Sequence, residues 1–352
     1  MRLRTVAVSV LAIALLAWFL RHANLAGVWV ELQRARVDLL VAAFLAVVLT
    51  YVIRAWRWQY MLHPIGPTRF RTAFRTTVIG FAALGILPAR AGDVLRPYLL
   101  ARQEGLSPTA TFATIIMERV LDLIAVLVLL AVFVWGIADP AMLPAAWIRP
   151  IEISAAIAGA SAVALMILMW VLASHPERIG RLVFAAARVL PHRMADRLAS
   201  LAQTFSRGFA VARDPRALAA AFAWSFPLWL VIAGEAWLVT IAFGIDMPFA
   251  GTFLLQGLLL IGVAVPTPGG VGSFHEAFRI GVTTFFRAPQ DAAVAAAIVT
   301  HAISYVPVVL TGILFMAQDG LSVGRLQEMA GTVSDKELSD SDEMPVLRPS
   351  GR

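Results

Sequence analysis

The chain has 352 residues, of which 60% are hydrophobic and only 14% are charged. This polar fraction is too small to cover a soluble globule of that length, so we predict an integral membrane protein. Cysteine is absent, which excludes disulfides, thiolate catalysis and cysteine-based metal sites. The net charge of +7 is carried almost entirely by arginine, and Lys336 is the one lysine. On a membrane chain this basic excess indicates topology, and no nucleic acid partner is expected.

Six apolar segments approach the length that crosses the hydrocarbon layer as a helix, which is about 20 residues. They lie at residues 5–20, 39–53, 120–137, 151–173, 217–243 and 292–317. Apolar residues cover nearly all of their faces, which predicts an all-α, polytopic transmembrane helix bundle. The first segment follows Arg2 and Arg4 and lacks a small-residue cleavage pattern, so it is expected to be an uncleaved anchor.

Arginine is concentrated in two connectors, residues 54–75 and 174–216. Positively charged loops stay on the cytoplasmic side, so both connectors are expected there, in a multi-pass protein of the cell (inner) membrane with both termini cytoplasmic. The second connector mixes arginine with apolar residues and is predicted to form amphipathic helices on the inner leaflet. Residues 1–320 are expected to form the transmembrane domain and residues 321–352 a disordered acidic cytoplasmic tail.

Two further apolar segments are broken by proline and glycine, at residues 77–96 and 252–279. Their uninterrupted parts, residues 77–87 and 252–265, are too short to span the bilayer upright. We predict two re-entrant broken hairpins whose polar backbone is shielded by protein or by water. The alternative is that both segments cross fully. A spanning segment precedes and follows each hairpin, which predicts an inverted repeat of the kind found in transporters.

The first hairpin carries three ionisable residues beside its proline and glycine: Arg90, Asp93 and Arg96. Ionisable groups at membrane depth are costly and usually functional. We interpret the three as a clamp for a headgroup phosphate, in which the arginines bind and Asp93 orients them. The alternative is an ordinary solvated turn at the cytoplasmic interface.

A second charged group follows at Glu118, Arg119 and Asp122. Glu118 and Asp122 are four positions apart and therefore share one face of a helix. Three functions suit them: to neutralise Arg90 or Arg96, to bind a cationic headgroup, or to relay protons. Alternatively, the two acids complement the dipole at a helix N-terminus.

The second hairpin contains a glycine-rich turn before a predicted helix. Its candidate binding residues are Gly269, Gly270, Gly272, Ser273, Glu276 and Arg279. Glycines ahead of a helix N-terminus present free amides and a positive dipole end, which favour an anion such as phosphate. The segment lacks the Gly-Lys-Ser of a Walker motif. In the alternative interpretation the glycines only allow helices to approach closely.

Two residues in the apolar segments are candidates for coupling to an ion gradient. Glu235 is an acid deep inside residues 217–243, and His301 lies within residues 292–317. Acids in such positions commonly bind a coupling ion. For His301 the alternative is a hydrogen bond within the bundle.

Aromatic and basic residues alternate at the end of the second apolar segment. Arg54, Trp56, Arg57 and Trp58 lie there. We interpret them as an interfacial aromatic belt with arginines that reach toward the headgroups.

Four stretches together resemble the lysylphosphatidylglycerol synthase transmembrane family, also called the flippase-like membrane family. They are RAWRW at 54–58, LPARAGDVLR at 87–96, ERVLD at 118–122 and PTPGGVGSFHE at 266–276. The resemblance covers residues 5–320 and implies a bundle that handles lipids, some relatives moving an aminoacylated phosphatidylglycerol between leaflets. Relatives that make that lipid carry a soluble aminoacyl-transferase domain. Because an acidic tail stands at that place here, synthase activity is not implied.

Together these observations favour translocation of a lipid or lipid-linked substrate between leaflets. The expected partner is an anionic phospholipid or a polyprenyl-linked lipid, bound by the charged residues of the two hairpins. No catalytic residue, metal or cofactor is expected. The alternative is a membrane-embedded enzyme that acts on a polyprenyl- or phospholipid-phosphate substrate.

Overall fold

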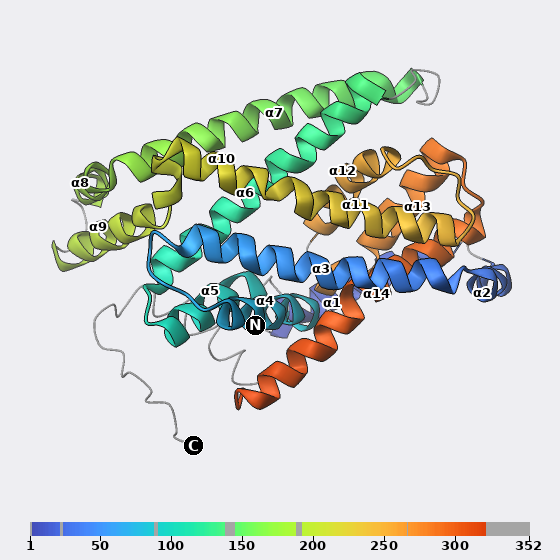
Figure 1. The fold of residues 1–352 in the computed structure, drawn as a ribbon, viewed down its shortest axis with the longest axis horizontal. Coiled ribbons are helices and arrows are strands. Elements are labelled where there is room, and N and C mark those ends of the chain that lie inside the picture. Colours follow the sequence, from blue (N-terminus) through green and yellow to red (C-terminus); the bar gives the residue numbers. More distant parts are fainter. Residues whose placement is uncertain are drawn as a thin grey trace.

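The computed structural model describes residues 2–21, 24–87, 91–137, 145–187, 192–265 and 267–321. Within these residues the chain forms helices and loops and no strand, so the all-α prediction is confirmed. The longer helices are α1 (Arg2–Leu20), α2 (Leu25–Arg34), α3 (Val37–Leu62), α4 (Phe70–Ile86), α5 (Ala91–Glu104), α6 (Pro108–Val132), α7 (Ala145–Ser174), α8 (Pro176–Ala186), α9 (His192–Arg207), α10 (Pro215–Ala223), α11 (Ser225–Ala242), α12 (Gly251–Ala264), α13 (Ser273–Phe286) and α14 (Gln290–Gln318). Figure 1 shows their arrangement.

Four helical segments of the described residues are long and apolar enough to cross a membrane. They are α3, the stretch Glu152–Ser174 of α7, the stretch Pro215–Ala242 formed by α10 and α11, and α14. The apolar stretch of α1 becomes a fifth only together with α2, from which it is bent by 81°. The predicted spans at 39–53, 151–173, 217–243 and 292–317 fall on the four.

The predicted span at 120–137 is displaced from the helix that contains it. α6 begins earlier, at Pro108, and ends at Val132, where a π-helical turn, Phe133–Ile137, continues it. Proline suits the first helical position, and the Ser107 hydroxyl accepts a hydrogen bond from the amide of Ala110. The prediction started too late because the charged residues at 118–122 masked the first half of the helix.

Both predicted hairpins form a pair of short helices that pack on each other, α4 with α5 and α12 with α13. Each pair is interrupted where a proline follows: Leu87 and Val265 are extended, with ψ of 143° and 124°. A residue before proline disfavours the helical region, which explains both breaks. α12 has 14 residues and is therefore about 21 Å long, short of the roughly 30 Å hydrocarbon layer. Re-entry of the hairpins stays a prediction.

Two sets of helices, α3 to α6 and α11 to α14, make the same contacts. Within each set, neighbouring helices pack on each other and the last packs on the first. Between the sets, α3 packs on its counterpart α11. The contact of α4 with α14 corresponds to that of α12 with α6, and the contact of α3 with α14 corresponds to that of α11 with α6. Every one of these contacts has a counterpart when the sets are exchanged, which is the pattern expected from two copies of one unit related by two-fold symmetry.

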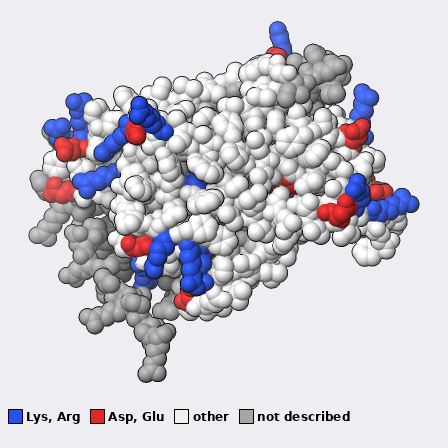
Figure 2. Space-filling model, viewed as in Figure 1, with Lys and Arg blue, Asp and Glu red and all other residues white. Residues whose placement is uncertain are grey.

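The two hairpins occupy opposite halves of the molecule. α4 and α5 lie in the half that holds α8 and α9, whereas α12 and α13 lie in the half beside α2 (Figure 1). Charged side chains gather mainly at the two ends of the molecule and leave a broad uncharged band between them (Figure 2). That band is suited to the hydrocarbon layer. The predicted acidic tail lies, beyond Leu321, outside the described residues.

Candidate functional site

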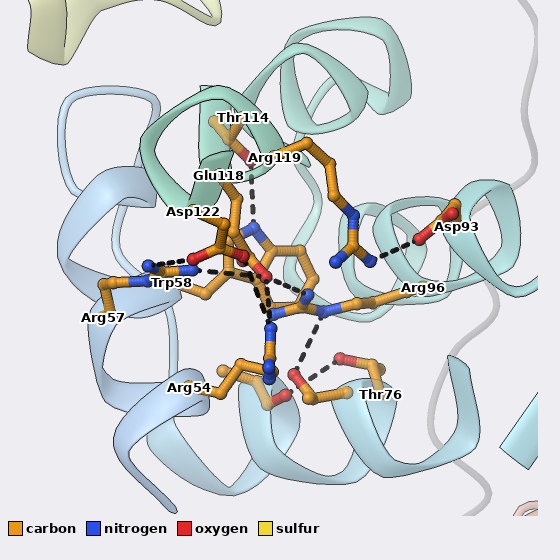
Figure 3. Close-up of polar contacts among 12 residues, drawn as sticks. Arg54, Arg57, Trp58, Thr76, Asp93, Arg96, Thr114, Glu118, Arg119 and Asp122 are labelled. Carbon is orange, nitrogen blue, oxygen red and sulfur yellow. Dashed lines mark hydrogen bonds and ion pairs between the residues drawn. The ribbon is translucent and has the colours of Figure 1, made fainter. Parts of the chain in front are cut away.

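Five charged side chains from three helices meet inside the first helix set (Figure 3). We name this group the arginine cluster; it consists of Arg54 and Arg57 on α3, Arg96 on α5, and Glu118 and Asp122 on α6. Their side chains are no more than 8% exposed. Fully buried charges are costly unless they are paired, so the geometry of the pairs decides what the cluster can do.

Glu118 lies at the centre of the arginine cluster. Its Oε1 accepts hydrogen bonds from Arg96 Nη1 at 3.0 Å and from Arg54 Nη1 at 3.4 Å. Arg57 Nη2 lies 3.6 Å from the same oxygen. One carboxylate oxygen therefore faces three guanidinium groups, while its other oxygen has no hydrogen-bond partner.

Asp122 connects the arginine cluster to α11. Its Oδ1 accepts hydrogen bonds from Arg57 Nη1 at 2.6 Å and from Trp229 Nε1 at 3.1 Å. Arg57 Nη1 also donates to the Ser225 hydroxyl at 2.8 Å. Since Trp229 and Ser225 belong to the second helix set, these bonds join the two sets at the cluster.

Besides its ion pair with Glu118, Arg96 contacts a threonine and a tryptophan. Its Nε donates to the Thr77 hydroxyl of α4 at 3.1 Å, and its guanidinium carbon lies 3.9 Å from the centre of the Trp58 ring. The indole of Trp58 in turn donates to the Thr114 hydroxyl of α6 at 2.9 Å. Stacking on an aromatic face suits arginine and adds to the ion pair.

The arginine cluster has more donors than it uses. Three guanidinium groups face two carboxylates, which leaves an excess of positive charge. Four guanidinium nitrogens have no hydrogen-bond acceptor, against two carboxylate oxygens, Glu118 Oε2 and Asp122 Oδ2, that have no donor. The four nitrogens are Arg54 Nε, Arg57 Nε, Arg57 Nη2 and Arg96 Nη2. Buried donors of native proteins are nearly always satisfied, so such a concentration of free donors and positive charge suits an added anion.

A second polar group lies in the second helix set and involves the corresponding helices. We name it the neutral cluster; it consists of Glu235 on α11, His275 on α13, and His301, Ser304 and Tyr305 on α14. The Ser304 hydroxyl donates to Glu235 at 2.5 Å. No ion pair of Glu235 is found among the described residues, although the side chain is buried.

Rings connect the rest of the neutral cluster. The ring centres of His275 and His301 are 4.6 Å apart, and His301 stacks on Tyr305 at 4.3 Å. His301 Nε2 lies 2.8 Å from the carbonyl oxygen of Gly269, at the tip of the second hairpin. His301 is thus hydrogen-bonded within the bundle, the alternative considered for it above.

The last turn of α4 lies against the glycine-rich turn of the second hairpin, next to this cluster. A Cβ atom placed at Gly269 would lie 3.6 Å from the Cα of Gly85 near the end of α4, and 3.8 Å from the ring of Tyr305. Gly269, Gly270 and Gly272 have φ of 60°, 71° and 85°, which favours glycine. The end of α4 therefore packs on the turn that breaks the second helix set.

A family model described as the lysylphosphatidylglycerol synthase TM region matches residues 5–312. The chain belongs to this family. A glycosyltransferase named AglD from Haloferax volcanii is 26% identical over 95% of the chain and 57% of its own length. A UPF0104 membrane protein from Methanothermobacter thermautotrophicus is 25% identical over 75% of the chain and 78% of its own length. The chain thus spans little more than half of the AglD relative.

In this family member the first predicted clamp is arranged differently from the expectation. Arg96 pairs with Glu118, as one interpretation of the acid pair predicted. Asp93 does not contact Arg96; it pairs with Arg119 at 2.6 Å, where both side chains are partly exposed. The prediction that Asp93 orients Arg96 is therefore wrong, because α5 turns the two side chains to different neighbours. Arg90 lies outside the described residues.

The second predicted clamp pairs internally. Arg279 donates to both oxygens of Glu276, at 2.8 Å and 2.5 Å, and also to the Gln290 side chain. Ser273 donates to the Gly270 carbonyl at 3.3 Å. The Glu276 and Arg279 side chains are 17% and 18% exposed, so this ion pair is less buried than the arginine cluster. An anion site at this turn stays a prediction.

The interpretation of residues 54–58 as an aromatic belt is mostly wrong. Of these residues only Trp56 is exposed, at 56%, whereas Arg54, Arg57 and Trp58 are buried. A sequence signal existed: Arg54, Arg57 and Trp58 follow helical spacing, as do Thr114, Glu118 and Asp122 on α6. Complementary charged stripes on two apolar helices could have indicated that the stripes face each other.

Proposed function

We propose that this family member moves a lipid with an anionic headgroup between the two leaflets, and that the arginine cluster binds the headgroup phosphate. The observation that carries the proposal is the excess of buried guanidinium groups, with N–H donors that have no acceptor. A phosphodiester supplies the missing negative charge and several acceptor oxygens, and the guanidinium fork matches its geometry. The acyl chains would stay in the hydrocarbon layer.

The cluster is closed in this conformation, so a headgroup requires the first hairpin to move. Arg96 is the arginine of the cluster that lies on this hairpin; Arg54 and Arg57 are on α3. A shift of α5 would separate Arg96 from Glu118 and open the cluster on one side. The hairpin is tightly packed, since a Cβ at Gly80 would lie 2.6 Å from the Cβ of Arg96. We therefore expect α4 and α5 to move as one unit.

The neutral cluster is proposed to couple transport to an ion gradient, with Glu235 as the ion-binding group. Its carboxyl group contacts the Ser304 hydroxyl, and no described cation neutralises it. A buried acid of this kind can bind a cation or a proton on one side of the membrane and release it on the other. The partner of Glu235, Ser304, is next in sequence to Tyr305, whose ring lies beside Gly269 of the second hairpin, so we expect a change at Glu235 to affect this hairpin.

Leaflet exchange in proteoliposomes tests the proposal. Vesicles with fluorescent phosphatidylglycerol are treated with a membrane-impermeant quencher, and the quenched fraction reports exchange. Wild-type protein should raise that fraction above protein-free vesicles, and Arg96→Gln should abolish the increase. Arg69→Gln is the matched control, since it removes the same charge from an exposed side chain. Exchange that persists unchanged in a folded Arg96→Gln protein would refute the assignment.

The orientation in the membrane is proposed from the arginine distribution, with the α8 and α9 end in the cytoplasm. The chain has no cysteine, so single cysteines can be introduced without further changes. A cysteine at exposed Arg216 should react with an impermeant maleimide only after the inner face is opened. A cysteine at Gly136, in the π-helical turn that follows the C-terminus of α6, should react in intact cells. The reversed pattern would invert the topology.

An enzyme acting on a polyprenyl- or phospholipid-phosphate substrate is the second candidate. The similarity to the Haloferax volcanii glycosyltransferase favours this candidate, although the match covers 57% of that protein. Incubation with radiolabelled polyprenyl phosphate and activated sugar, followed by chromatography, distinguishes the two. A new labelled product in the absence of leaflet exchange would replace the translocation proposal.

A further inference from the structure

Two adjoining cavities lie at the α8 and α9 end of the molecule. The larger, of about 570 Å³, is bounded by the end of α9, the start of α8 and the turn before α6, and the smaller, of about 280 Å³, lies beside α8. Pro176, Glu177 and Arg213 line both, so the cavities share a wall. The larger cavity falls within the size range of small-molecule sites, about 300–1,000 Å³.

The walls of these cavities are basic. Arg207 and Arg213 line the larger one, and Arg178 and Arg181 line the smaller one with Arg213. The carboxylate that lines them is Glu177. No ion pair of the four arginines is found within the described part of the chain. Arg213 Nε donates to the Ala173 carbonyl, which fixes this arginine at the shared wall.

The surrounding helices suit the surface of a bilayer. α8 and α9 pack on each other, and each carries an exposed apolar residue, Leu182 at 65% and Met194 at 50%. Amphipathic helices with basic polar faces lie at the level of the lipid headgroups. The cavities therefore lie where a headgroup reaches them, while the acyl chains of the same lipid remain in the adjacent leaflet.

We infer that these cavities form a second lipid site, which binds the headgroup of an anionic phospholipid from the leaflet on which α8 and α9 lie. The four arginines provide the charge, and the Gln203 and Thr204 side chains in the larger cavity provide neutral hydrogen-bonding groups for a glycerol headgroup. The site shares no residue with the arginine cluster. Its existence does not depend on the proposed translocation.

Thermal unfolding of the full-length protein in detergent, followed by tryptophan fluorescence, measures binding. Short-chain phosphatidylglycerol should raise the unfolding temperature at lower concentrations than phosphatidylcholine of the same chain length. In Arg181→Gln/Arg207→Gln the apparent affinity for phosphatidylglycerol should fall by about fivefold for each arginine removed. The matched control, Arg34→Gln/Arg36→Gln, removes two exposed arginines at the opposite end and should keep wild-type affinity.

Three results would overturn the inference. They are equal losses in the two double variants, equal affinities for the two lipids, or a response to inorganic phosphate as strong as that to phosphatidylglycerol. The last result would indicate a site for a soluble anion. Glu177→Gln offers a change in the opposite direction: removal of the lining carboxylate should tighten phosphatidylglycerol binding, and weaker binding would contradict the proposed role of charge.

Discussion

The arginine cluster and the neutral cluster occupy corresponding helices of two similar helix sets, but their chemistry is opposite. In the first set the polar groups are ion pairs, with Glu118 facing three guanidinium groups. In the second set the buried acid, Glu235 on α11, accepts a hydrogen bond from a hydroxyl. The same framework can therefore hold a fixed charge in one half and a carboxyl group without a counter-charge in the other. We expect the first arrangement to bind an anion and the second to exchange an ion.

The largest expected effect is the removal of the central carboxylate. Glu118→Ala leaves Arg54 and Arg57 with Asp122 and removes the carboxylate that pairs with Arg96. Breaking a buried ion pair costs about 3–5 kcal/mol. Reversible unfolding in mixed detergent micelles measures the loss. Asp38→Asn, which removes an exposed acid paired with Arg36, should leave the unfolding midpoint unchanged. If both variants unfold alike, the cluster does not stabilise the fold.

Arg96→Lys separates charge from geometry. The substitution keeps the positive charge but loses the guanidinium fork and the stacking on Trp58. We expect the free energy of unfolding to fall by about 2–3 kcal/mol. Leaflet exchange should fall more than with Arg119→Lys, whose partner Asp93 is partly exposed. Equal exchange in the two lysine variants would show that charge alone is needed and would weaken the assignment of the fork.

Gly272→Ala tests the backbone conformation and the packing of the second hairpin. Gly272 has φ of 85°, and a Cβ there would lie 2.6 Å from the Cβ of Leu15 on α1. We expect the free energy of unfolding to fall by about 2 kcal/mol or more, because of backbone strain and overpacking. Gly234→Ala is the control, because a Cβ at Gly234 meets no atom within 4 Å. A Gly272→Ala protein as stable as Gly234→Ala would contradict both the backbone strain and the close contact with α1.

Ser304→Ala should have the smallest effect on stability. It removes one hydrogen bond to Glu235, which should lower the free energy of unfolding by about 1 kcal/mol. Its effect on transport should be larger than its effect on stability, because the hydroxyl sets the surroundings of the coupling carboxyl. The measurement is exchange with and without an imposed ion gradient. If the gradient changes exchange equally in the wild type and in Ser304→Ala, the Ser304 hydroxyl has no part in the coupling.

Sequence patterns predicted the positions of the helices better than they predicted the contacts between side chains. The prolines after Leu87 and Val265 predicted both breaks, because the residue before a proline avoids the helical region. The partner of Arg96 was correctly included among the alternatives, since Glu118 and Asp122 share a helical face. The role of Asp93 was wrong, because proximity in sequence does not decide which way two side chains on α5 point.

The sequence by itself determined the class of protein, the apolar helices and the two breaks, because these follow from composition and from local backbone preferences. Only the tertiary structure decided that Arg54, Arg57 and Arg96 converge on Glu118, and that Gly85 of α4 lies against Gly269. The physical reason is distance along the chain. Charges on α3, α5 and α6 become neighbours only when the apolar faces of those helices pack, and no local pattern fixes that packing.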